Sequence, residues 1–315
     1  MHHFTAHPDD LLIVVSRIVG DETSTPAQSI KNGEVFQHPD LDTDHEEADI
    51  RIIPHAVNAV RHSCMARIVI LSSDTDVFVV AMYFYHLLAA HGLAELWLRG
   101  GVGDKTRFIP LHVIAGKVGK PVCEVLPAIH ALTGCDITSK FGTKAAGIKA
   151  QPVLYLKDFG RAHTDVQDCV QNAEKFLVQV LNRGNHGIET MDRLRFSWYH
   201  HRKSMTITDL PPTSYGTQGH IQRAFYATYI QLNCLGDFLL NPQDYGFTLE
   251  SECLVPKTYH RLLPDEVSLK CNCVKCAYRS CPCRERNVRC CMFCKCQEDT
   301  QCKNCKNPNG VILTK

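Results

Sequence analysis

One stretch of the sequence decides the fold class: Ile68-Val69-Ile70-Leu71-Ser72-Ser73-Asp74-Thr75-Asp76. Its first four residues are apolar and mostly β-branched, which predicts a buried parallel strand. The polar residues end that strand, and residues 77–91 then have the composition of a helix that Gly92 closes. A strand that leads through a short polar turn into a helix is typical of α/β proteins.

The segments on either side extend this pattern. Residues 95–99 and 106–109 are predicted strands around a glycine-rich turn, and residues 11–15 are a candidate strand. Residues 48–60 have helical apolar spacing that we expect Pro54 to interrupt. Further helices are predicted at 112–118, 122–132, 166–181, 191–201 and 219–232. We therefore expect an α/β domain with a mostly parallel sheet, followed by a helical extension.

The composition excludes several classes of protein. The chain has 315 residues, of which 44% are hydrophobic and 21% charged, so it is expected to fold rather than remain disordered. Eleven of its 17 cysteines lie between Cys271 and Cys305, whereas a secreted disulfide scaffold is cysteine-dense throughout. The N-terminal residues do not resemble a signal peptide, and the apolar run at 11–19 is too short to cross a membrane. A reducing compartment, no membrane contact and metal-binding cysteines are the expectation.

Carboxylates follow the predicted strand and recur in two other places. Asp74 and Asp76 end the strand, where open α/β sheets bind ligands, and their oxygens suit a hard cation such as Mg²⁺ or Mn²⁺. Helix capping is the alternative explanation of the pair, and the haloacid phosphatase fold also places Asp-x-Asp after a strand. The other two places are Glu46-Glu47-Ala48-Asp49, at a predicted helix start, and Gly134-Cys135-Asp136 followed by Gly142-Thr143-Lys144. A glycine turn that opens a helix can hold phosphate.

The order of these three motifs resembles the flap-endonuclease (XPG-type) branch of PIN-like nucleases, over residues 42–150. The resemblance implies a PIN-like Rossmannoid fold and five carboxylates that ligate two divalent ions for phosphodiester cleavage: Glu47, Asp49, Asp74, Asp76 and Asp136. It also implies that Gly142, Thr143 and Lys144 hold one DNA strand by its backbone. The family's basic arch has no counterpart in the 46 residues before Glu47. An inactive nuclease-like fold and an Asp-x-Asp phosphatase are the alternatives.

The cysteine tail has three Cys-x-Cys pairs separated by short gaps, which does not suit isolated zinc fingers. Its spacing resembles the CXC domain of tesmin/TSO1-type proteins and of the male-specific-lethal ubiquitin ligase. That family uses nine cysteines for three structural zinc ions and binds DNA. The matching residues are Cys271, Cys273, Cys276, Cys281, Cys283, Cys290, Cys294, Cys296 and Cys305. Cys291 and Cys302 are surplus, and either can displace a neighbour in this set. Disulfides or a metallothionein-like metal buffer are the alternatives.

Charge favours a nucleic-acid partner for this tail. From Cys271 onward nine Lys or Arg residues face three acids, so the tail carries +6 and the rest of the chain −5. Nine thiolates with three zinc ions would leave the tail at about +3. The residues best placed for DNA are Tyr278, Arg284, Arg286 and Arg289. A solvated basic surface is the alternative. We expect a nuclear protein.

The predicted organisation is an N-terminal strand and loop (1–41), a PIN-like core (42–160), a helical extension (161–234), a linker (235–270) and a CXC domain (271–308). This pairing resembles animal proteins derived from mobile elements. Two functions follow from it. The first is a DNA-binding protein with a divalent-metal-dependent, structure-specific nuclease. The second is a catalytically inactive DNA-binding protein of chromatin.

Overall fold

The computed structural model describes these parts of the chain: 13–15, 27–31, 34–41, 48–63, 66–182, 187–201, 209–236, 240–259, 271–274, 276, 281–285, 290, 294–296 and 302–304. The chain divides into two compact units. The first unit contains residues 1–185 and 220–256, and the second contains 186–219 and 257–315. The first is an α/β domain, and the second carries a cysteine cluster.

The central sheet of the first unit has three strands in the order β4 (Arg67–Leu71), β5 (Glu95–Gly100) and β6 (Arg107–Pro110). β4 and β5 are parallel, which confirms the predicted strand–helix–strand unit, whereas β5 and β6 are antiparallel. The short connection from β5 to β6 is the reason, because parallel strands need a crossover of a dozen residues or more. The mostly parallel sheet expected from the sequence is therefore absent from the described residues, which hold one parallel pair in a small mixed sheet.

Helices cover one face of this sheet. They are α1 (Ala48–Ser63), α2 (Thr75–Ala90), α3 (Leu111–Val118) and α4 (Lys120–Thr133). Their apolar side chains form one core with the inward-facing Ile70, Leu96 and Leu98 of the strands. Val69 and Leu71 alternate to the opposite face and are exposed, so the strand predicted as buried has one open side. The break expected at Pro54 is not found: α1 continues through it, with Ile53 and Val57 buried on either side.

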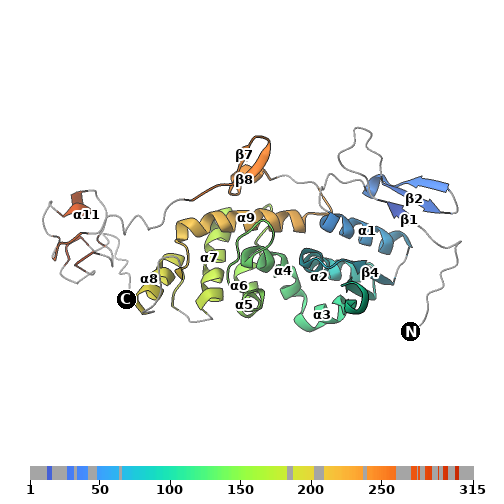
Figure 1. Cartoon of the computed structure of the whole chain (residues 1–315), viewed down its shortest axis with the longest axis horizontal. Helices are drawn as coiled ribbons and strands as arrows, with labels where there is room; N and C mark the ends of the chain where they lie inside the picture. The colour runs from blue at the N-terminus through green and yellow to red at the C-terminus, as the bar shows by residue number, and fades with distance from the viewer. Residues whose placement is uncertain are drawn as a thin grey trace. The chain divides into compact units, whose positions relative to one another are not determined.

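Further helices continue the first unit beyond α4 (Figure 1). They are α5 (Lys144–Lys149), α6 (Pro152–Leu156), α7 (Val166–Asn182) and α9 (Ser214–Leu232). α2 packs on α4, α4 on α6, and α6 on α7. Residues 220–232 of α9 belong to the first unit, where the Phe225 ring packs edge-on against Phe159 with ring centroids 5.2 Å apart. In the second unit, α8 (Met191–His201) matches its predicted range.

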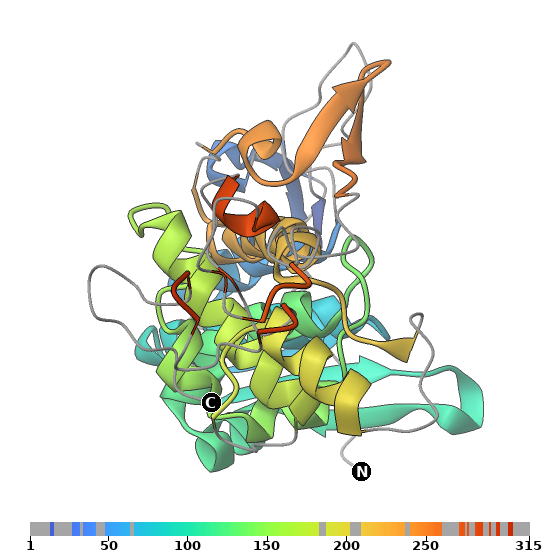
Figure 2. The same cartoon turned by 90° about the vertical axis from the view of Figure 1, so that its left-hand side faces the viewer.

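Small elements complete the described structure. β1 (Ile13–Val15), β2 (Gln28–Lys31) and β3 (Glu34–Gln37) form an antiparallel sheet. The segment predicted as a linker holds a hairpin, β7 (Phe247–Glu250) and β8 (Cys253–Pro256), drawn in orange in Figures 1 and 2, where it projects from the helices. The 3₁₀ turns are Pro39–Leu41, Gly103–Lys105 and Pro242–Asp244, and α11 (Pro282–Glu285) lies in the cysteine tail. Among the described helices none is long and apolar enough to span a bilayer.

Candidate functional site

The first candidate site begins where β4 leads into α2. Asp74 is the N-cap of α2, and its carboxylate accepts a hydrogen bond of 2.8 Å from the backbone N–H of Asp76. Ser72, two residues before Asp74, also contributes, because its hydroxyl accepts a hydrogen bond of 3.0 Å from the Asp74 N–H. Asp74 therefore caps α2, which is one of the two roles that its position after a strand suggested. Asp76 lies in the first turn of α2, where a carboxylate is also favoured by the helix dipole.

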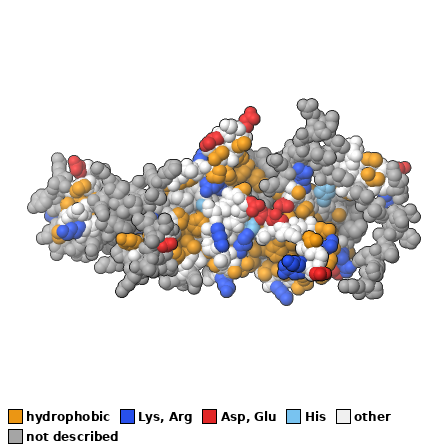
Figure 3. All heavy atoms as spheres, in the orientation of Figure 1, with side chains coloured by type: hydrophobic (Ala, Val, Ile, Leu, Met, Phe, Trp, Pro, Cys, Tyr) orange, Lys and Arg blue, Asp and Glu red, His pale blue; other side chains and the backbone are white. Residues whose placement is uncertain are grey.

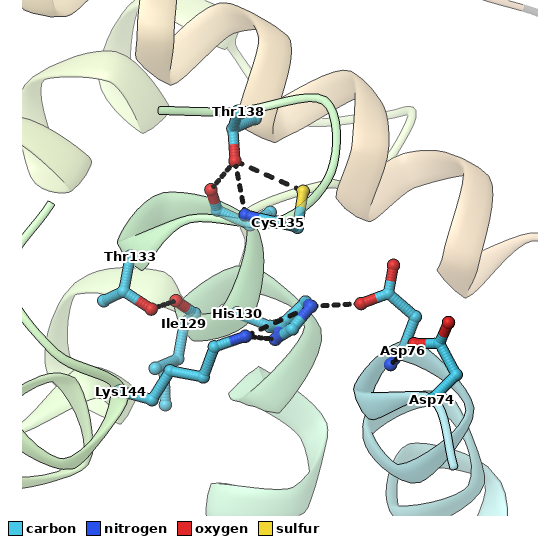
Figure 4. Close-up of polar contacts among 9 residues, drawn as sticks. Asp74, Asp76, Ile129, His130, Thr133, Cys135, Thr138 and Lys144 are labelled. Carbon is cyan, nitrogen blue, oxygen red and sulfur yellow. Dashed lines mark hydrogen bonds and ion pairs between the residues drawn. The ribbon is translucent and has the colours of Figure 1, made fainter. Parts of the chain in front are cut away.

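His130 on α4 joins Asp76 to Lys144 (Figure 4). The His130 Nε2 pairs with the Asp76 carboxylate, and its Nδ1 contacts the Lys144 amine. The imidazole is only 3% exposed, whereas Lys144 is at the surface end of the chain of contacts. No motif in the sequence selects His130. Its one distinguishing signal is that it is a lone polar residue in the apolar stretch 125–132 of α4.

The loop between α4 and α5 closes the site. Gly134 opens it at φ +119°, and a Cβ there would lie 2.9 Å from the Cα of Lys140, so only glycine fits. The Thr138 hydroxyl donates to the Ala131 carbonyl at 2.6 Å and accepts from the Cys135 N–H at 3.0 Å (Figure 4). Thr143 then caps α5, since its hydroxyl accepts from the Ala146 N–H at 3.1 Å.

These elements enclose a pocket of about 460 Å³. Its lining includes most of the residues predicted for catalysis or for holding a DNA strand: Asp74, Asp76, Asp136, Gly142, Thr143 and Lys144. His130, Thr138 and Lys140 also line it. Figure 3 shows a patch of acidic side chains near the middle of the view, with basic side chains close to it. The pocket therefore combines carboxylates with cations that can hold a phosphate group.

The charges of the pocket influence one another. Burial raises the pKa of Asp49, on the first turn of α1, and the charges of Asp74, Asp76 and Asp136 raise it further. Burial also raises the pKa of Asp76, but the hydrogen bond and charge of His130 and the charge of Lys144 bring it below its ordinary value. Burial lowers the pKa of the Lys144 amine, and the charges of Asp76 and other acidic groups offset part of that effect. Asp49 thus belongs to the same electrostatic cluster as the pocket.

The carboxylates do not form a ready metal site. Within the described part of the chain, the only groups whose three or more ligand atoms lie within 4.8 Å of one another are groups of cysteines. The Asp74 carboxylate caps α2 and the Asp76 carboxylate pairs with His130, so oxygens that a cation would need are already engaged. Glu47 lies outside the described residues.

The second candidate site is the cysteine cluster of the second unit. Three groups of four cysteines are close enough to hold a metal ion, and Cys271 belongs to all three. The groups are Cys271, Cys281, Cys283, Cys290; Cys271, Cys273, Cys276, Cys281; and Cys271, Cys276, Cys290, Cys296. No described cysteine forms a disulfide. The structure thus gives a C-terminal cluster with several possible Cys₄ metal sites.

The sulfur separations fit zinc rather than disulfides. Cys271 Sγ lies 3.5 Å from Cys276 Sγ and 3.7 Å from Cys290 Sγ, and Cys283 Sγ lies 3.7 Å from Cys294 Sγ. Two thiolates that share a tetrahedral zinc ion at a Zn–S bond of about 2.3 Å are about 3.8 Å apart, whereas bonded sulfurs are about 2.05 Å apart. The donor set and its spacing are those of structural thiolate sites.

The thiol pKa values favour the protonated form of several cysteines in the absence of a metal ion. Burial and neighbouring sulfurs raise the pKa of Cys276 and Cys290, and burial with Cys294 raises that of Cys283 to about 12. Sulfurs packed this closely keep their protons unless a metal ion balances the thiolate charge. Burial acts in the same sense on Cys281, but hydrogen bonds from the backbone of Arg284 and Cys283 bring its pKa to about 7.

The remaining predicted residues divide into two sets. Tyr278, Arg286, Arg289, Cys291 and Cys305 lie outside the described residues. Arg284, on α11, donates a long hydrogen bond of 3.5 Å to the Cys276 carbonyl, so it braces the cluster. Cys302, counted as surplus from the sequence, is 1% exposed and packs among the cluster sulfurs.

Comparison with known proteins adds no family to this description. No protein-family model matches the chain, and neither the curated proteins nor the solved structures contain a significant match to it. The structure therefore establishes an α/β domain and a C-terminal cysteine cluster suited to metal ions such as zinc, with no family identified.

Proposed function

We propose that the protein is a nuclear DNA-binding protein whose C-terminal cysteines hold about three structural zinc ions in one thiolate-bridged cluster. The observation that carries the cluster is the sharing of Cys271 by all three Cys₄ groups. Nine thiolates fill three tetrahedral sites only when some of them bridge, and shared cysteines supply such bridges. We expect these zinc ions to be structural, because a zinc ion held by four cysteines has no open coordination position.

DNA is the proposed partner because the tail remains basic after metal binding. Its +6 charge falls to about +3 when nine thiolates bind three zinc ions. Arg286 and Arg289 then provide phosphate contacts, which give affinity without sequence preference.

A binding measurement on the full-length, zinc-loaded chain tests this function. Fluorescence anisotropy with a labelled duplex is expected to show that the double variant Arg286→Ala/Arg289→Ala binds about tenfold more weakly, with a salt dependence reduced by about two phosphate contacts. The matched control is Lys149→Ala/Lys157→Ala, two exposed cations of the α/β domain, which should bind like the wild type. Equal affinity of all three proteins would contradict the proposed DNA contact.

A second candidate function, a divalent-metal-dependent DNA phosphodiesterase with a PIN-like fold, rests on the pocket. Three aspartates and two lysines line one pocket of about 460 Å³. Lys140 and Lys144 would hold a phosphate, while Asp49, Asp74, Asp76, Asp136 and Glu47 would recruit Mg²⁺ or Mn²⁺ that activates water. Binding of a metal ion there requires the Asp76 carboxylate to leave His130. The alternative is a pocket without catalytic activity, and the Asp76–His130 pair favours that alternative.

Cleavage of single-stranded and flap DNA with Mn²⁺ distinguishes the two. An active enzyme would lose at least about a hundredfold in rate in Asp136→Asn, while Asp104→Asn, on the exposed 3₁₀ turn after β5, would keep full rate. Equal rates in wild type and Asp136→Asn would mean a contaminating nuclease. Intact DNA binding without any cleavage would establish the inactive DNA-binding protein.

A further inference from the structure

Cys302 is placed differently by the sequence pattern and by the structure. The pattern assigns the ninth zinc ligand to Cys305 and leaves Cys302 surplus. In the structure Cys302 is 1% exposed, and its thiol interacts with the thiol of Cys276. Cys302 belongs to none of the three possible Cys₄ groups, but it adjoins Cys276, a sulfur that two of them share.

The residues that follow Cys302 are fastened to the same cluster. The Cys290 N–H donates to the Asn304 carbonyl at 3.3 Å, and the Asn304 side-chain amide donates to Cys290 Sγ at 3.3 Å. Cys290, like Cys276, belongs to two of the groups. Asn304 is thus held through both its backbone and its side chain, which fixes the position of the Cys302 thiol two residues earlier.

The described cysteines of the tail are as many as three zinc ions need. Nine of them lie in the cluster region: Cys271, Cys273, Cys276, Cys281, Cys283, Cys290, Cys294, Cys296 and Cys302. All but Cys273 are buried. The three Cys₄ groups use seven of these cysteines, with Cys271 in all three and Cys276, Cys281 and Cys290 in two each. Cys294 and Cys302 belong to none of the groups, but both are buried among the same sulfurs. Three tetrahedral zinc ions are satisfied by nine thiolates of which three bridge, and these two sulfurs bring the seven to nine.

We propose that Cys302 is the ninth zinc ligand of this cluster and that Asn304 positions it, with its amide as a hydrogen-bond donor to the shared thiolate of Cys290. This rests on the proposed zinc cluster. An N–H donor on a bridging thiolate reduces the negative charge on sulfur and orients it, as outer-sphere partners do at other metal sites. Cys291 and Cys305 are then dispensable for zinc.

Zinc content of the purified full-length chain, by plasma mass spectrometry, tests the assignment. Cys302→Ser is expected to fall from about three to about two zinc ions per chain, while the matched variants Cys305→Ser and Cys291→Ser keep about three. Three ions in Cys302→Ser together with two in Cys305→Ser would overturn the inference and leave the cluster standing. A wild type with one zinc ion or none would overturn the cluster itself.

A measurement on the wild type keeps the inference testable if Cys302→Ser does not fold. The zinc-loaded chain is treated briefly with N-ethylmaleimide, and modified cysteines are mapped by mass spectrometry. Cys302 should react at least about tenfold more slowly than the exposed Cys253, because a metal-bound buried thiolate is shielded. In Asn304→Ala, a chelator should remove the first zinc ion about tenfold faster. Equal labelling of Cys302 and Cys253 would overturn the assignment.

Discussion

The carboxylate of Asp76 pairs with the imidazole of His130, a side chain that is 3% exposed. Because Lys144 contacts the other ring nitrogen, one histidine links the start of α2, the end of α4 and the start of α5. The pocket is therefore assembled around a buried imidazole. Burial raises the pKa of Asp76, but the hydrogen bond and charge of His130 help to bring it below its ordinary value, whereas burial lowers the pKa of Lys144.

Removing this imidazole should destabilise the α/β domain. His130→Ala leaves the half-buried Asp76 without its partner and is expected to lower the free energy of unfolding by about 3 kcal/mol. His130→Gln, which keeps an N–H donor, should recover part of the loss. Urea unfolding followed by circular dichroism measures both. The exposed His163→Ala is the control and should change stability by less than about 0.5 kcal/mol.

The local structure was predictable where short-range patterns decide it. The run Ile68–Leu71 and the helix after it were found because β-branched residues and apolar spacing act within one element. Pro54 shows the limit: its local signal favours a break, but burial of Ile53 and Val57 against the rest of the core keeps α1 continuous. The hairpin at β7 and β8 was missed because its turn residues, Ser251 and Glu252, adopt positive φ without being glycine or asparagine.

The residues that make up the candidate sites were predictable from the sequence, but the side chains with which they pair were not. Asp74, Asp76 and Asp136 do line one pocket, yet nothing in the sequence indicates that Asp76 pairs with His130, 54 positions later. Likewise, cysteine spacing indicates a metal cluster, while the choice between Cys302 and its neighbours depends on how the chain folds back onto Cys290. Long-range contacts decide both cases.

Stability should depend on pH through His220 on α9. Burial lowers its pKa to about 4 in the folded chain. Its Nε2–H donates to the Leu132 carbonyl at 2.9 Å, and its Nδ1 has no hydrogen-bond partner among the described residues, so a second proton is unfavourable there. The unfolded chain takes up that proton near pH 6.5. The contribution is therefore complete above about pH 6.5 and is lost as pH falls toward 4.

The size of this effect is about 3 kcal/mol between pH 7 and pH 4. Urea unfolding at a series of pH values should show a shallower decline for His220→Gln than for the wild type. His163→Gln, which removes an exposed histidine, should follow the wild-type curve. Parallel curves for all three proteins would show that His220 does not titrate on unfolding.

The pocket loop should not tolerate a side chain at Gly134. Its φ of +119° and the approach of the Lys140 backbone make Gly134→Ala destabilising by about 2 kcal/mol. Gly116, inside α3, has nothing within 4 Å of the position that an added methyl group would take, so Gly116→Ala should stabilise by about 0.5–1 kcal/mol. Thermal unfolding of the two variants gives shifts of opposite sign. A destabilised Gly116→Ala would instead indicate hidden crowding on α3.

Loss of zinc should scale with the number of Cys₄ groups to which a cysteine belongs. Cys271 occurs in all three groups and Cys273 in one, while Cys253 lies exposed on β8 outside the cluster. Cys271→Ser is therefore expected to retain fewer than about one zinc ion per chain and Cys273→Ser about two, with Cys253→Ser equal to the wild type. Zinc analysis of the four purified proteins measures this order. Equal zinc losses in Cys271→Ser and Cys273→Ser would mean that the metal sites are separate, because at independent sites the removal of any ligand releases one ion. The removal of a shared thiolate instead takes a ligand from every ion that it bridges.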